Sequence, residues 1–154
     1  MPLLHVTLTP NAFDAAGKAV LARELTEAAF RAESVPNLPG PRTRGLLLMN
    51  ELPEGHCYSA GLPADAALRG VFVTLEVSVG VLDAVRRARF ASDIQEAAVK
   101  AAGDSDGRPV VTSAVIREVP EGQWAQGGRI MRLPEIAAIA GFEHMVPIAA
   151  RRAG

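Results

Sequence analysis

The sequence predicts an α/β fold in which tandem duplicated β-α-β units form a four-stranded sheet with two helices on one face. Three observations lead to it: short apolar segments of strand composition, two long segments with helical apolar spacing, and a glycine-containing turn that occurs twice. The chain has 154 residues, 49% of them apolar, which suits one domain with a single core. We therefore expect one domain over residues 1–148, with repeats at about 2–61 and 71–128, and a tail over 149–154.

The recurring turn carries the duplication most clearly. Residues 51–61 read ELPEGHCYSAG and residues 118–128 read EVPEGQWAQGG, with five identities at an offset of 67. The helical segment 24–29 aligns with 93–98 at an offset of 69. A two-residue difference in the connecting loop accounts for the change of offset, so the two halves are copies of one unit.

Each half is expected to contain a strand, a helix and a second strand. The strands are predicted at Leu3–Leu8, Gly45–Asn50, Val71–Val79 and Val110–Arg117. The helices are indicated by apolar residues three and four positions apart, namely Leu21, Leu25, Ala28 and Ala32, then Phe90, Ile94, Ala97 and Ala101. Because both strands of a unit flank one helix, they should run parallel through a right-handed crossover. The other sheet face is left bare, which predicts an oligomer.

Polar and proline residues mark the ends of these elements. Asn11 is expected to cap the first helix, with Asp14 in its first turn. The proline-rich segment 36–41 predicts a loop.

Composition excludes several classes of partner. The formal net charge is −1 with acids and bases mixed along the chain, so we expect no nucleic-acid and no membrane partner. No apolar run is long enough for a membrane span and no signal peptide is visible, so a cytoplasmic location is expected. The single cysteine, Cys57, allows no internal disulfide. His5, His56 and His144 lack ligand spacing, so we expect no metal and no cofactor.

Pro2 is the candidate catalytic residue. Methionine is usually removed when the second residue is small, and the mature chain would then begin with a secondary amine at a strand end. An ordinary α-amino group titrates at about 7.7–8.0, and burial or a nearby cation lowers that pKa and leaves more neutral base at pH 7. While Met1 stays attached, the Pro2 nitrogen is an amide and has no basicity.

Pro2 at the head of a strand, the duplicated halves and the Glu118–Gly128 turn together resemble the tautomerase superfamily, whose type member is 4-oxalocrotonate tautomerase. The resemblance covers about residues 2–131 and points to a fused, two-unit member. It implies a homotrimer whose bare sheet faces pack into a central barrel. It also implies an isomerase in which Pro2 is general base or acid on a small unsaturated 2-keto or 2-hydroxy carboxylic acid.

The sequence departs from the family at the arginines that hold the substrate carboxylate. The type member has arginines at the two positions that are Ala12 and Leu46 in this chain. Arg42 and Arg44, at the entry of the second strand, remain as candidates, because a guanidinium binds a carboxylate through two parallel hydrogen bonds. The other interpretation is that both are solvated loop arginines.

The two turns supply the remaining candidate substrate-binding residues, Tyr58 and Trp124. Trp124 occupies the aromatic position of the family turn, where it either walls the pocket or fills a subunit interface. Cys57 is its counterpart in the first half and is expected to be a small buried hydrophobe rather than a nucleophile.

Two alternatives remain open. The same scaffold also supports a hydratase, dehalogenase or decarboxylase of a three-carbon acid, although Ala29 stands about where the dehalogenases have a histidine. The second alternative is a non-catalytic trimeric module in which Pro2 is blocked or idle.

Overall fold

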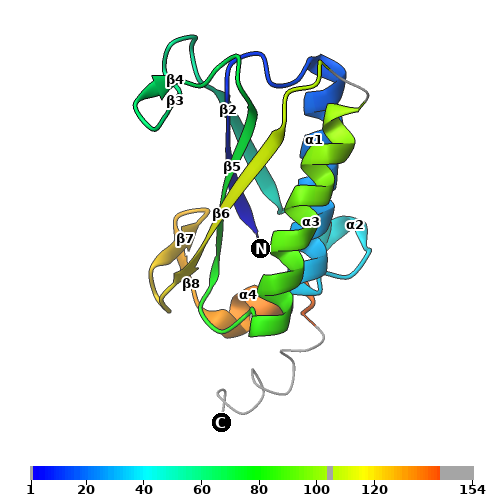
Figure 1. Ribbon diagram of the computed structural model, residues 1–154. Helices are drawn as coiled ribbons and strands as arrows, with labels where there is room; N and C mark the ends of the chain where they lie inside the picture. Colours follow the sequence, from blue (N-terminus) through cyan, green and yellow to red (C-terminus); the bar gives the residue numbers. More distant parts are fainter. Residues whose placement is uncertain (1, 104–105, 143–154) are drawn as a thin grey trace.

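The central feature of the computed structural model, which describes residues 2–103 and 106–142, is a four-stranded sheet with two long helices on one face (Figure 1). The elements in chain order are β1 (Leu3–Leu8), α1 (Ala15–Glu33), α2 (Pro39–Arg42), β2 (Leu46–Glu51), β3 (Tyr58–Ser59), β4 (Leu62–Pro63), β5 (Arg69–Ser78), α3 (Ala84–Ala102), β6 (Val110–Val119), β7 (Trp124–Gln126), β8 (Arg129–Met131) and α4 (Leu133–Ala140). The predicted tail over 149–154 lies outside the described residues.

The sheet has the strand order β2-β1-β5-β6. The strands of each half are parallel, as the crossover argument predicts, and β1 and β5 join the halves as an antiparallel pair. The register repeats the sequence offsets, because Leu3 pairs with Leu46 while Phe72 pairs with Ser113. Leu3 and Phe72, in the first strands of the two halves, are 69 positions apart, and Leu46 and Ser113, in the second strands, are 67 apart. The duplication therefore holds residue by residue in the sheet.

The two long helices are copies of one another. Each has 19 residues and follows an aspartate whose carboxylate accepts a hydrogen bond from the backbone of the first turn, Asp14 in α1 and Asp83 in α3. The cap is therefore Asp14 and not Asn11, which adopts a left-handed conformation with φ of 52° before the helix begins. The helices cross closely at Gly17, where a Cβ atom would lie 2.9 Å from the carbonyl oxygen of Ala101.

The core lies between the sheet and these helices. Alternate residues of β1 and β5 point toward the helices and are at most 2% exposed, namely Leu4, Val6 and Leu8, then Val71, Val73, Leu75 and Val77. The predicted helical stripes supply the opposite side, with Leu21, Leu25, Phe90 and Ile94 all buried. Every second residue of the strands faces the apolar side of the helices, where residues three and four apart share one face, so the two layers form one continuous core.

The sheet face opposite the helices is uncovered in the single chain and carries apolar side chains. Leu46 and Leu48 on β2 are 57% and 52% exposed, and Val115 on β6 is 51% exposed. Phe72 and Val111 are also exposed on this face. We call these five side chains the open apolar face; a monomer rarely leaves such a surface in water.

Several elements were missed in the sequence. Residues 36–41, predicted as a loop, include the start of the short helix α2, for which Pro39 supplies the fixed φ of a first helical position. The hairpins β3–β4 and β7–β8 form where each recurring turn was expected, and α4 buries Leu133 and Ile136 against the core. Among the described residues, no helix combines the length and apolarity needed to cross a bilayer.

Candidate functional site

A small pocket lies at the start of β1, and three of the predicted site residues line it. Its volume is about 180 Å³. The lining residues are Pro2, Leu3, Arg44, Leu46, Trp124, Ala125 and Gln126. The pocket thus places Pro2, Arg44 and Trp124 together, although they come from three separate parts of the chain.

Pro2 is held at the head of the sheet. It is buried, and its carbonyl oxygen accepts a hydrogen bond of 3.1 Å from the backbone N–H of Leu46, which extends the β1–β2 pairing by one residue. Gly45 precedes Leu46, and a Cβ atom on it would lie 2.6 Å from the ring of Phe30 and 3.7 Å from Cγ of Pro2. A glycine is therefore required for the chain to pass between Pro2 and Phe30.

Arg44 and Arg42 occupy different environments. Within residues 2–103 and 106–142, no carboxylate is close enough to form an ion pair with Arg44, and its side chain is exposed at the pocket. Arg42 instead forms an ion pair with Glu27 and lies over the ring of Phe30, 4.5 Å from the ring centroid. Arg42 therefore lines a separate hollow with Glu27 and Phe30 and not the pocket at Pro2.

The second half of the chain supplies one wall of the pocket. Strand β6 runs antiparallel to β1 within the sheet, so its end lies near the start of β1, and the β7–β8 hairpin follows directly (Figure 1). Trp124 packs partly against the core, and Gln126 is exposed two residues further on the same strand. Side chains two apart on a strand share a face, so Gln126 follows Trp124 along the pocket. Sequence reasoning missed Gln126, although this alternation pointed to it.

Tyr58 lies elsewhere. It belongs to the β3–β4 hairpin at the opposite end of the sheet and is 61% exposed (Figure 1). The adjacent Cys57 is a free, half-buried cysteine, less buried than predicted. Within this chain, Tyr58 and Pro2 do not share a pocket.

Among the described residues, the positions of the second half that correspond to the Pro2 pocket carry different chemistry. The repeat offsets match Pro2 with Val71, Arg44 with Val111, and Trp124 with Cys57. Val71 lies within the continuous strand β5, so it has no free amine, and Val111 carries no charge. Within residues 2–103 and 106–142, the duplication therefore does not repeat this combination of residues.

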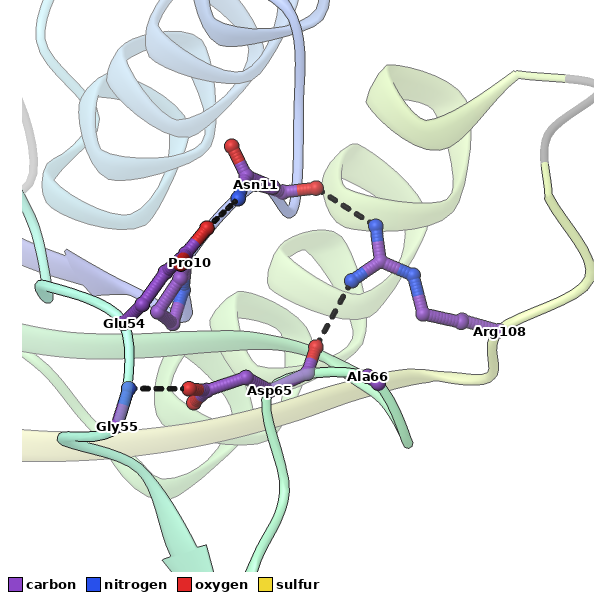
Figure 2. Close-up of a pocket in the computed structure, with 7 residues that line it drawn as sticks. All are labelled: Pro10, Asn11, Glu54, Gly55, Asp65, Ala66 and Arg108. Carbon is purple, nitrogen blue, oxygen red and sulfur yellow. Dashed lines mark hydrogen bonds between the residues drawn. The ribbon is translucent and has the colours of Figure 1, made fainter.

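A second cavity, of about 570 Å³, lies near the β3–β4 end (Figure 2). Arg108 bridges it by donating to the carbonyl oxygens of Asn11 at 2.6 Å and of Asp65 at 3.0 Å. The Asp65 carboxylate accepts from the N–H of Gly55 at 2.6 Å, and the Asn11 side chain donates to Glu54. Apart from Oδ1 of Asp65, which is buried without a hydrogen-bond partner among the described residues, these polar groups pair with one another. The predicted site residues line no part of this cavity.

Burial and hydrogen bonding shift the pKa of several carboxyl groups outside the pocket, and Glu33 and Asp106 show the two opposite directions. Glu33, in the last turn of α1, is fully buried, and burial raises its pKa. A hydrogen bond from Arg69 is the main reason that the pKa of Asp106 falls to about 2. Within residues 2–103 and 106–142, histidine, cysteine and carboxylate side chains form no group of three that could hold a metal ion.

Comparison with known proteins gives the fold. No protein-family model and no curated protein matches the chain. Among solved structures, the R7 fused 4-OT asymmetric trimer matches with a TM-score of 0.65 and 21% identity, over 83% of this chain and 94% of that one. Pt0534 inactivated by 2-oxo-3-pentynoate matches with a TM-score of 0.66 and 16% identity, over 83% of this chain and 94% of that one. Macrophage migration inhibitory factor of Toxoplasma gondii matches with a TM-score of 0.57 and 16% identity, over 84% of this chain and 99% of that one.

The chain therefore has the α/β fold of the tautomerase superfamily, and the resemblance expected from its sequence is confirmed for the fold. Its structural neighbours include fused 4-OT proteins, several of which are described as trimers.

Proposed function

We propose that, once Met1 is removed, the chain is a tautomerase-type isomerase of a small unsaturated 2-keto or 2-hydroxy carboxylic acid. The observation that carries this proposal is one juxtaposition. Pro2 lies in the same small pocket as Arg44, a cation that forms no ion pair among the described residues. A base and an uncommitted guanidinium together fit an anionic acid that must gain and lose a proton.

Pro2 supplies the proton transfer. As the terminal residue it carries a secondary amine whose lone pair takes the proton from the 2-hydroxyl group of a dienol. The resulting ammonium returns the proton to a carbon of the same molecule, and the 2-hydroxy acid becomes the 2-keto acid. The apolar walls formed by Leu3, Leu46 and Trp124, with Arg44 beside them, favour the neutral amine that starts this sequence.

Arg44 holds the substrate. Its guanidinium can donate two parallel hydrogen bonds to the carboxylate. It also stabilises the negative charge that moves onto the 2-oxygen when the dienol loses its proton. Because no protein carboxylate competes for it among the described residues, this arginine is available to the ligand.

We also propose a homotrimer, formed through the open apolar face. The trimeric state of the fused 4-OT neighbours supports it, as does the exposure of Leu46, Leu48 and Val115 in the single chain. Pt0534, a structural neighbour, is inactivated by the small acid 2-oxo-3-pentynoate. That precedent makes an electrophilic 2-oxo acid a suitable probe for this chain.

The test begins with protein whose N-terminus is confirmed as Pro2 by intact mass. Ketonisation of phenylenolpyruvate and of 2-hydroxymuconate is followed by ultraviolet absorbance. Pro2→Ala should lower kcat/KM by roughly 10²-fold or more, and Arg44→Ala should raise KM. Arg23→Ala, a matched change on the exposed surface of α1, should leave the rate unchanged. An unaltered rate in Pro2→Ala would refute the assignment.

A further inference from the structure

One carboxyl group lies in the core and has no part in the proton transfer described above. Glu33, in the last turn of α1, is 0% exposed, and among the described residues it is the most deeply buried side chain that ionises. Removing a carboxylate from water is costly unless a cation or hydrogen-bond donor compensates it. The position of Glu33 in the fold indicates which group that is.

The topology places Glu33 at the level of Pro2. Since α1 joins the parallel strands β1 and β2, it runs against them, and its last turn lies at the end of the sheet where both strands begin (Figure 1). Leu4, Val6 and Leu8 face the helices, and Pro2 continues this alternation and is buried too. Pro2 and Glu33 therefore share the layer between sheet and helix, on the side away from the open apolar face.

The contacts of Phe30 support this placement. Phe30 lies three residues before Glu33, so the two share one face of α1. A Cβ atom on Gly45 would lie 2.6 Å from the Phe30 ring and 3.7 Å from Cγ of Pro2. The helix face that carries Glu33 thus faces the start of β1.

The terminal amino group of the chain acts on Glu33. Burial raises the pKa of this carboxyl group, while the charge of the terminal amino group and a hydrogen bond from it oppose the rise. Removal of Met1 places that amino group on Pro2, and adjacent Cα atoms are only about 3.8 Å apart. The ordinary pKa is about 7.7–8.0 for an α-amino group and about 4.3 for glutamate, so a proton shared by the two belongs to the nitrogen.

Other ionisable side chains at this end of the sheet are held by partners of their own. Arg44 is the exception, and it acts on Pro2 from the pocket, which Glu33 does not line. The groups with other partners are Arg42 with Glu27, Asp93 with Arg31, Glu76 with Arg117, and Glu135 with the backbone N–H of Arg132.

We propose that Glu33 is a positioning residue for the terminal amine of Pro2, a role whose catalytic consequence rests on the isomerase proposed above. A neutral secondary amine has one N–H and one lone pair. The Glu33 carboxylate accepts a hydrogen bond from the N–H, on the core side, and the lone pair is thereby directed to the pocket.

The carboxylate also stabilises the ammonium that forms in the reaction. The amine takes the proton from the 2-hydroxyl group, holds it beside Glu33, and returns it to a carbon of the substrate. Glu33 gains and loses no proton and ends the cycle unchanged. A buried carboxylate that orients a base and stabilises its protonated form has the same role in the Ser-His-Asp triad.

The pKa of the Pro2 amine gives a direct test. The Met-trimmed protein is labelled with ¹³C-proline and titrated by NMR, since only the terminal one of the 11 prolines carries an amine. Glu33→Gln, which keeps the size of the side chain, should lower the pKa of the Pro2 amine by at least 1. Glu33→Leu, which suits an apolar core, should lower it as far.

The matched control is Glu24→Gln, the same change on the same helix at a carboxylate that pairs with Lys100. It should leave the pKa of the Pro2 amine within 0.3 of the wild type. An unchanged value in either Glu33 variant, or an equal fall in Glu24→Gln, overturns the proposal.

A second measurement needs no variant. In wild-type protein labelled with ¹³C-glutamate, one side-chain carboxyl carbon should respond with the same midpoint as the Pro2 ring, because protonation of the amine changes the field at its partner. The absence of such a carbon also overturns the proposal.

Turnover separates this proposal from the isomerase. Glu33→Gln should lower kcat for a ketonised dienol at least tenfold and leave KM within twofold, because Glu33 does not touch the substrate. If the wild type ketonises no dienol but the Glu33 variants lower the pKa of the amine, the isomerase is refuted and the pairing stands. If dienols are ketonised and that pKa does not respond to Glu33, the pairing is refuted and the isomerase stands.

Discussion

The guanidinium of Arg42 lies over the ring of Phe30, 4.5 Å from its centroid, and the same ring leaves no room for a side chain on Gly45 beside Pro2. Arg42, Phe30 and Gly45 thus form one stack that ends at the proposed catalytic residue. In this arrangement Arg42 supports the position of Pro2, whereas Arg44 faces the pocket itself.

Arg42→Ala should act on stability and not on substrate binding. A cation over an aromatic ring contributes about 0.5–2 kcal/mol, depending on how far the pair is desolvated. We therefore expect the free energy of unfolding in urea to fall by about that amount. KM for a ketonised dienol should stay within twofold of wild type, while the matched variant Arg44→Ala raises it tenfold or more. A KM defect in Arg42→Ala equal to that of Arg44→Ala would contradict this division.

Gly45→Ala should destabilise the fold by about 1–3 kcal/mol, because its methyl group would overlap the Phe30 ring. The double variant Gly45→Ala with Phe30→Leu removes that overlap. In the leucine background the cost of the alanine should be smaller by at least about 0.5 kcal/mol, a coupling measured by a double-mutant cycle of urea unfolding. Strictly additive effects would mean that the ring is not what excludes a side chain at position 45.

Asp106 should contribute to acid stability. Its pKa in the folded chain is about 2, below the ordinary 3.8, chiefly because Arg69 donates a hydrogen bond to it. A carboxyl group whose folded pKa is lowered stabilises the fold above its unfolded pKa and loses that effect as the pH falls toward 2. Asp106→Asn should therefore flatten the decline of unfolding free energy between about pH 4 and pH 2.

The control for that measurement is Glu96→Gln, on the exposed surface of α3, which should keep the wild-type dependence on pH. If Asp106→Asn loses stability between pH 4 and pH 2 as steeply as the wild type does, the Arg69 pairing does not persist in solution.

The open apolar face should hold the proposed trimer together. Leu48 and Val115 lie in one row across the sheet, on its two outer strands. Leu48→Lys or Val115→Lys would place charges in that contact and should convert a species of three times 16.2 kDa into monomer, as measured by sedimentation. Val85→Lys, the same change at an exposed apolar residue of α3, should leave the mass unaltered. A wild-type monomer at micromolar concentration would refute the trimer.

Much of the fold could be predicted because the physical signals are local. Leu3–Leu8 was predicted as a strand with its observed bounds, since alternation and strand composition lie in six consecutive residues. The two helices followed from apolar spacing, and the topology followed from the repeated order of elements. The hairpins could not be predicted, because strands of two or three residues are too short to show an alternation of apolar and polar residues.

The site was harder to predict because it depends on tertiary contacts. Arg42 and Arg44 are two residues apart and look equivalent in the sequence, yet Arg42 is held by Glu27 and Phe30. Neither partner is near it in the chain. Gln126 enters the pocket only because β6 runs antiparallel to β1, a relationship set by the pairing of β1 with β5 and of β5 with β6.

The mismatch between Pro2 and Val71 has a consequence for how the two copies of the unit have diverged. Only the copy at the front of the chain can carry a terminal amine, because the nitrogen of Val71 is an internal amide within β5. The β7–β8 hairpin of the second copy, with Trp124 and Gln126, instead lines the pocket that contains Pro2 of the first copy. The halves are thus not interchangeable: separated at the linker, the front half would keep Pro2 without the hairpin that encloses it, and the rear half would keep that hairpin without Pro2.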